Sequence, residues 1–105
     1  MPEQTVATDD IVVEDNPEES RYEARLGDRI VGIAEYELVD EAGPIVFTHT
    51  EVLPEAEGQG VGGKLARTAL DDVRRRDLRM VVECPFIASW VRRHHDYDDL
   101  IDRIA

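Results

Sequence analysis

The chain has 105 residues and a formal net charge of −12, with 42% hydrophobic and 34% charged residues. This length suits one domain with a modest core, and the apolar share argues against a wholly disordered chain. The acid excess argues against direct nucleic-acid binding, and no apolar run approaches the roughly 20 residues that span a bilayer. Since no leader-like segment opens the chain either, we expect a cytoplasmic protein without a membrane partner.

An acidic segment begins the chain. Residues 1–20 contain seven acidic residues, two prolines and no basic residue. Such a composition is typical of a solvated terminal tail, so we expect a tail here, with a short strand at 11–14. Residues 21–105 are expected to form the single folded domain.

Alternating apolar and polar residues then predict three strands joined by turns. In chain order, we expect a strand at 21–26, a tight turn at Gly27–Asp28, a strand at 29–39, a turn at 40–44, a strand at 45–53 and a loop at 54–57.

The second half of the chain changes to a helical period. Apolar residues that recur three or four positions apart predict a long helix at 61–76. A short buried strand at 80–84, a helix at 86–95 and a short terminal helix at 97–104 are expected to follow. Because a strand–helix–strand crossover makes its two strands parallel, we expect an α/β fold with a mixed sheet covered by helices.

Four glycines gather in residues 57–64, EGQGVGGK, between a predicted strand and the long helix. Glycine is costly there unless the backbone needs a positive φ or must approach something closely. At a strand-to-helix junction the usual reason is a phosphate held by backbone N–H groups at the positive end of the helix. Three phosphate-binding patterns fit the segment.

The first pattern is the nucleotide-binding P-loop. Gly58, Gly63 and Lys64 have the required spacing, but Leu65 stands where a Ser or Thr should hold magnesium. Leu65 also belongs to the apolar stripe of the predicted helix, which indicates a core position.

The second pattern is the dinucleotide fingerprint. Gly58, Gly60 and Gly63 match it, and Glu83 follows about 20 residues later, as a ribose ligand should. Against this interpretation, a loop at 54–57 separates the strand from the first glycine. The preceding strands are joined by hairpins, and too little chain follows for a doubly wound sheet.

The third pattern is the coenzyme A pyrophosphate loop of the GNAT acetyltransferases, whose motif is Gln/Arg-x-x-Gly-x-Gly/Ala. The chain resembles it over residues 57–62, although Glu57 replaces the usual Gln or Arg. Further segments in the same order are similar to the very small, single-domain GNAT-like subgroup. They are His49–Val52, Ala69–Asp72, Cys84–Phe86, and Arg92–His94 with Tyr97.

The resemblance implies a mostly antiparallel sheet whose parallel fourth and fifth strands splay apart to admit acetyl-CoA as co-substrate. The backbone of Glu51, Val52 and Leu53 would pair with the pantetheine amides, as an added strand does. The remaining contacts implied for the cofactor come from the glycine loop and nearby cations: Gln59, Gly60, Val61, Gly62, Gly63, Lys64 and Arg93.

Acetyl transfer to an amine needs a proton acceptor, and the family often places a glutamate on the fourth strand. Period-two alternation puts Phe47, His49, Glu51 and Leu53 on one strand face, which we expect to be buried. Glu51 or His49 is therefore a candidate base. The alternative is a strand-end Glu beside a hydrogen-bonded core His.

Two more residues are candidates for the chemistry. Cys84, the only cysteine, is a nucleophile for an acetyl-cysteine intermediate or a small apolar wall. Tyr97 lies where many GNATs place the acid that protonates the leaving thiolate, or else it packs between helices. We expect no metal, because His94 and His95 are adjacent on a predicted helix and point about 100° apart.

The acceptor is expected to be an amine, either a small molecule or a Lys-containing peptide, and the acidic surface favours a cationic one. Only residues 16–20 occupy the stretch where larger GNATs place two helices. The acceptor cleft should therefore be open, or completed by the second subunit of a homodimer. Two other functions stay possible at this point: a non-catalytic acyl-CoA-binding module, and a structural domain that binds no cofactor.

Overall fold

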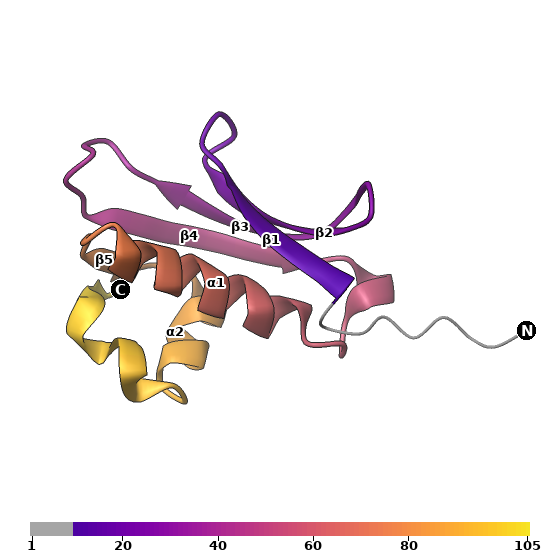
Figure 1. Ribbon diagram of the computed structural model, residues 1–105. Helices are drawn as coiled ribbons and strands as arrows, with labels where there is room; N and C mark the ends of the chain where they lie inside the picture. Colours follow the sequence, from indigo (N-terminus) through magenta and orange to yellow (C-terminus); the bar gives the residue numbers. More distant parts are fainter. Residues whose placement is uncertain (1–9) are drawn as a thin grey trace, which may run out of the picture.

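Six strands form one sheet in sequence order in the computed structural model, which describes residues 10–105 (Figure 1). They are β1 (Ile11–Asn16), β2 (Arg21–Leu26), β3 (Arg29–Glu37), β4 (Ile45–Val52), β5 (Met80–Val82) and β6 (Ile101–Ile104). Strands β1 to β4 pair antiparallel, whereas β5 is parallel to both β4 and β6. The predicted mixed sheet is confirmed.

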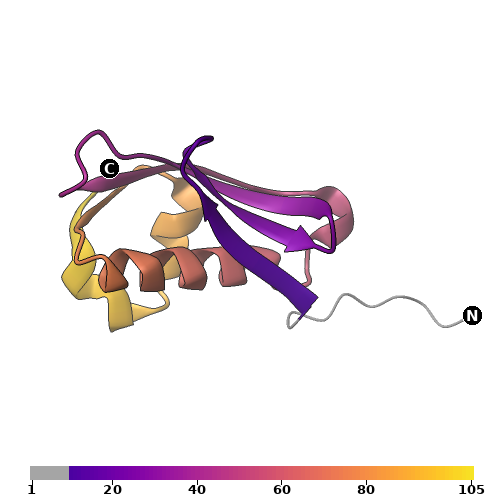
Figure 2. The ribbon, with the colours of Figure 1, turned by 45° about the horizontal axis from the view of Figure 1, so that its top comes forward.

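The two α-helices and the C-terminal 3₁₀ turn lie on one side of this sheet, and a shorter 3₁₀ turn follows the end of β4 (Figures 1 and 2). In chain order they are the 3₁₀ turn η2 (Pro54–Ala56), α1 (Val61–Arg75), α2 (Pro85–Val91) and the 3₁₀ turn η3 (His95–Leu100). The predicted apolar stripe of α1 is fully buried against the sheet: Val61, Leu65, Ala66, Ala69, Leu70 and Val73. No helix within residues 10–105 is long and apolar enough to cross a membrane.

The N-terminal strand is an integral edge of the sheet. The strand expected at 11–14 is present and two residues longer, and all six residues of β1 pair with β2. Ile11 is 1% exposed, so this edge contributes to the core. The part of the expected tail at 1–9 lies outside the described residues.

The expectation of a terminal helix at 97–104 is wrong. Residues His95–Leu100 form a 3₁₀ turn and Ile101–Ile104 form β6, which pairs with β5. Two half-buried isoleucines, Ile101 and Ile104, pack against the core there. The helix expected at 86–95 also ends early, at Val91.

An extra residue in β4 changes which side chains face the helices. Glu35 of β3 pairs with His49, but the next residue, Tyr36, pairs with Phe47, so Thr48 is inserted as a bulge. Because a bulge shifts the alternation by one residue, His49 and Glu51 turn to the sheet face away from α1. The expectation that they share a buried face with Phe47 is wrong.

Candidate functional site

Strands β4 and β5 separate after three pairs. The last pair joins Phe47 to Val82, and the backbone N–H groups of Glu83 and Cys84 then both donate to the Phe47 carbonyl oxygen, at 2.9 and 3.0 Å. Strand β4 continues to Val52 without a β5 neighbour in the described chain. One edge of β4 is therefore available to another extended molecule.

The backbone that faces this gap can be identified from the hydrogen bonds. The Leu53 N–H donates to the Val31 carbonyl oxygen of β3 at 2.9 Å. Since successive residues of a strand direct their backbone groups to opposite sides, Val52 and Thr50 present theirs toward the gap. Of the predicted stretch Glu51 to Leu53, the middle residue is thus placed to pair with a ligand.

A cleft of about 390 Å³ opens at this place. Its three walls come from β4, from the glycine loop and from α2. The lining residues are Thr50, Val52, Ala56, Glu57, Gly58, Gly60, Val61, Gly62, Gly63 and Phe86. The cleft therefore joins the unpaired edge of β4 to the beginning of α1.

Gly60 shapes the entrance to α1. It is the N-cap residue in the left-handed conformation, with φ +80°, and its carbonyl accepts the first helical hydrogen bond from Lys64 N–H at 3.0 Å. The N–H groups of Val61, Gly62 and Gly63 then lie in the first helical turn, where no intrahelical acceptor exists. With no acidic residue in this turn, the helix end suits an anion.

Packing against α2 gives a second reason for glycine at position 62. Both are helical, and a Cβ atom at Gly62 would lie 2.6 Å from Cζ of Phe86. One at Gly63 would lie 3.7 Å from Nε1 of Trp90. Gly62 thus lets an aromatic side chain of α2 approach α1 closely, a role that the sequence did not reveal, whereas a Cβ at Gly63 would make only ordinary contact.

Cys84 lies where the two strands separate. It precedes α2, is 1% exposed, and its Sγ lies 3.2 Å from Oγ1 of Thr50. Thr50 was missed by the sequence analysis because an unbulged strand would turn it away from the helices. The structure thus brings together Thr50, Cys84 and the inner end of the cleft.

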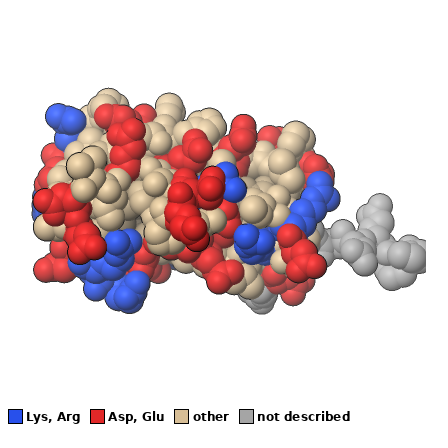
Figure 3. Space-filling view, turned by 90° about the horizontal axis from the view of Figure 1, so that it is seen from above, with Lys and Arg blue, Asp and Glu red and all other residues tan. Residues whose placement is uncertain are grey.

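The two candidate bases lie on the other face of β4. Nε2 of His49 is 3.9 Å from Oε1 of Glu51, and their side chains are 55% and 68% exposed. Glu51 also lines a shallow hollow with Arg21, Ile33 and Leu53. Figure 3 shows this side of the sheet, where acidic side chains are widely spread.

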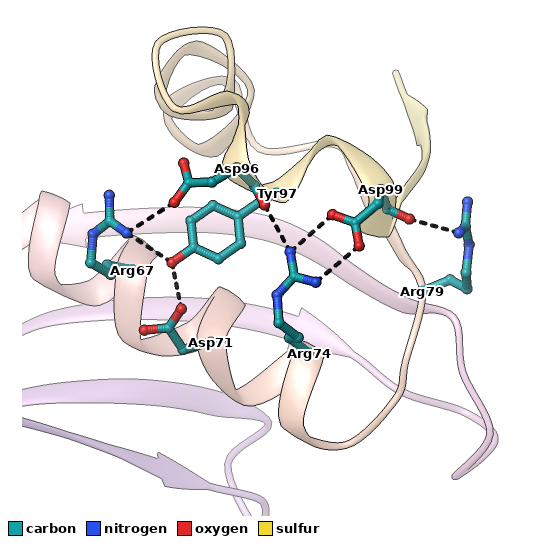
Figure 4. A network of polar contacts seen from close by, with 7 residues as sticks. All are labelled: Arg67, Asp71, Arg74, Arg79, Asp96, Tyr97 and Asp99. Atoms are coloured by element: carbon teal, nitrogen blue, oxygen red, sulfur yellow. Dashed lines mark hydrogen bonds and ion pairs between the residues drawn. The ribbon is translucent and has the colours of Figure 1, made fainter.

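Tyr97 belongs to a polar network between α1 and η3 rather than to the cleft lining (Figure 4). Its hydroxyl donates to the Asp71 carboxylate at 2.5 Å and accepts from Arg67 at 3.0 Å. Burial, together with the hydrogen bond to Asp71, raises the pKa of Tyr97 to about 12. Arg67 also forms an ion pair with Asp96, so Arg67, Asp71, Asp96 and Tyr97 are joined in one network of hydrogen bonds and ion pairs.

The remaining cations and histidines lie outside the cleft lining. Lys64 lines a groove on the outer side of α1, and Arg93 is exposed just after α2. His94 stacks on Trp90 at 3.9 Å between ring centroids, whereas His95 pairs with Asp98. Within residues 10–105, no group of three or more His, Cys, Asp or Glu side chains is arranged to hold a metal ion.

Comparison with known proteins adds two similarities. A family model described as GCN5-related N-acetyl-transferase matches residues 21–100. The NMR solution structure of a GCN5-like protein from Staphylococcus aureus is similar with a TM-score of 0.67, covering 91% of this chain and 92% of that chain. At 22% sequence identity, this second likeness concerns the fold alone. No curated protein matches the chain.

Proposed function

Since this chain belongs to the GCN5-related N-acetyltransferase family, we propose that it binds acetyl-CoA in the cleft beside β4 and transfers the acetyl group to an amine. Family membership supports acyl transfer as the reaction class. The finer proposal rests on one observation. The N-terminus of α1, which follows the left-handed Gly60, and the unpaired edge of β4 border the same cleft. The helix N-terminus can bind a phosphate, and the strand edge can hydrogen-bond to the amides of a pantetheine arm.

The parts of the co-substrate have natural places along this cleft. The pyrophosphate is held by the first-turn N–H groups of α1, at Val61 to Gly63. The pantetheine arm pairs with the backbone of Val52 and runs toward Thr50. The thioester then lies at the inner end, near Cys84, where β4 and β5 separate.

We favour direct attack by the amine. Glu51 does not line the cleft itself, but it lies between the lining residues Thr50 and Val52 on the opposite face of β4. The amine would approach from that face, where Glu51 accepts its proton and the adjacent His49 supports the carboxylate. Once Glu51 has taken one proton, the neutral nitrogen bonds to the carbonyl carbon and the carbon–sulfur bond breaks. Coenzyme A leaves as a thiolate, which takes up the second proton that the nitrogen loses. Glu51→Gln should lower kcat about 100-fold, the usual scale of general base catalysis, while Glu37→Gln at an exposed strand end should not.

A covalent route through Cys84 is the rival chemistry. Cys84 is 1% exposed as a residue, so an acceptor or a thioester reaches its thiol only after a local opening, which favours direct attack. A Cys84→Ala enzyme should therefore keep most of its turnover. An inactive Cys84→Ala protein that still binds CoA, with a single acetyl adduct on the parent by mass spectrometry, would establish the covalent route instead.

The acceptor is proposed to be a cationic amine, because the face from which it arrives carries many acidic side chains (Figure 3). Acetyl-CoA consumption against pooled polyamines, amino sugars and Lys-rich peptides, at low and high salt, tests this. Turnover that weakens with salt is expected. Acetyl-CoA binding without turnover of any amine would indicate a non-catalytic acyl-CoA-binding module.

A further inference from the structure

The cleft beside β4 contains few polar side chains. Among the described residues that line it, only Thr50 and Glu57 have one, and Glu57 belongs to the glycine loop. An ionised carboxylate only accepts hydrogen bonds, whereas a hydroxyl also donates one. Within the described part of the chain, Thr50 is therefore the lining residue whose side chain can donate to a ligand.

The contact of this hydroxyl with Cys84 leaves its proton available. Oγ1 of Thr50 lies 3.2 Å from Sγ of Cys84, and this is its one hydrogen bond within residues 10–105. Either atom could donate, but a hydroxyl oxygen is a better acceptor than the weakly accepting sulfur of a thiol. When the Cys84 S–H donates to Oγ1, the Thr50 O–H can point into the cleft that Thr50 lines.

The sulfur that leaves in acetyl transfer needs such a donor. Its negative charge develops as the carbon–sulfur bond breaks, in a cleft whose other side chains are mostly apolar. Tyr97, the acid that the family resemblance implies, lies outside the cleft lining, and its hydroxyl donates to Asp71. The pantetheine arm, as proposed above, ends beside Thr50 instead.

We propose that the hydroxyl of Thr50 donates a hydrogen bond to the sulfur of coenzyme A and stabilises the negative charge that this sulfur gains during acetyl transfer. This inference rests on the proposed function. Thr50 keeps its proton: the electron pair of the broken bond passes to the sulfur, which then takes up the proton that the nitrogen loses. Cys84 only orients the hydroxyl, which agrees with the small effect expected of Cys84→Ala.

The test follows the thiol of bound CoA through the ultraviolet absorbance of its thiolate. Cys84 is the only cysteine, so in Cys84→Ala the coenzyme carries the one thiol present. A hydrogen-bond donor favours the thiolate and thus lowers the pKa of the bound thiol. Glu57, the one carboxylate among the described lining residues, is unchanged in every variant and affects all of them alike.

We expect the bound CoA thiol to have a pKa about one unit lower in Cys84→Ala than in Cys84→Ala with Thr50→Val, a tenfold change in its acid dissociation constant. Thr50→Ser in place of Thr50→Val should restore the lower pKa. Thr68→Val, at a half-buried threonine outside the cleft lining, is the matched control and should leave it unchanged.

Equal pKa values with and without the Thr50 hydroxyl, in proteins that bind CoA, would overturn the inference and leave the proposed site intact. A parent that does not bind CoA would overturn the proposed function and this inference with it.

Calorimetric titration of proteins that keep Cys84 gives an answer even if Cys84→Ala does not fold. Desulfo-CoA, which lacks the sulfur, is the internal reference, and Thr50→Val should bind it within about threefold of the parent affinity. The loss of CoA affinity in Thr50→Val should instead grow toward about tenfold as the pH rises above about 8.5, the ordinary pKa of a thiol. A loss that stays constant with pH, or that is equal for desulfo-CoA, would overturn the inference.

Discussion

The two ends of α1 are built in opposite ways. At its beginning, the cleft is formed mainly by glycines, backbone N–H groups and apolar side chains, with Glu57 as the one acidic side chain among the described lining residues. Along its outer side toward the end, Arg67 and Arg74 pair with η3 around Tyr97 (Figure 4). The charged side chains on this helix thus stabilise the fold, whereas the proposed ligand site depends mainly on glycines and backbone N–H groups.

The polar network joins the outer side of α1 to the C-terminal segment. Arg74 binds the Asp99 carboxylate and the Asp96 carbonyl oxygen, and Arg79 binds Asp102. Exposed ion pairs are individually weak, but several that share partners fix the position of a segment. The C-terminal segment thereby holds α1 against the sheet while its first turn stays accessible to a ligand.

The largest expected effect is at the open end. Gly60→Ala should weaken CoA binding at least about tenfold, or about 1.4 kcal/mol, because relief of the left-handed backbone strain redirects the first-turn N–H groups. Gly27→Ala is the matched control, since Gly27 also has a positive φ and lies in the β2–β3 turn. Calorimetric titration should show the loss in the first variant only. Equal CoA affinity in both folded variants would place the phosphates elsewhere.

A smaller effect is expected on the charged side. Tyr97→Phe removes the hydrogen bonds to Asp71 and Arg67, which should cost about 1 kcal/mol of the free energy of unfolding. Urea unfolding measures this loss, and turnover with acetyl-CoA should stay near the parent value because Tyr97 does not line the cleft. A stable Tyr97→Phe enzyme with strongly reduced kcat would instead restore Tyr97 as the acid that protonates the leaving thiolate.

The smallest effect concerns alkaline pH. Burial and a carboxylate partner raise the pKa of Tyr97 to about 12, and the same two causes raise the pKa of Tyr22 and Tyr36. Above a pH of about 10 the unfolded chain loses these protons first, so stability is complete below that pH and falls as the pH rises toward 12. The unfolding free energy should decline less steeply in Tyr97→Phe than in the parent. Parallel declines would contradict the assigned Tyr97 environment.

Much of the fold follows from local patterns in the sequence. The strands at 21–26 and 45–53, the long helix and the glycine loop were predicted because periodicity and turn residues are local signals. The family resemblance drawn from separated motifs is confirmed. The terminal strand β6 was missed because four residues are too few to show alternation, and their pairing with β5 is a tertiary effect.

The site was less accessible to sequence reasoning. No local signal marks Thr48 as an inserted residue, yet this bulge decides that Thr50 faces the cleft and Glu51 the open side. Gly62 and Phe86 belong to different helices, so the sequence does not reveal their contact and indicates only phosphate binding for Gly62. Tyr97 could not be matched with Asp71 for the same reason, since 26 positions separate them. The catalytic roles of Glu51, His49, Cys84 and Tyr97 stay predictions.

A thermal-shift titration with acetyl-CoA and with NAD tests the central claim most directly, namely that the cleft beside β4 holds coenzyme A. A ligand selective for the folded state raises the melting temperature progressively with its concentration. Such a rise is expected with acetyl-CoA and CoA, none with NAD, and a much smaller one in Gly60→Ala. Stabilisation by NAD without stabilisation by CoA would contradict it.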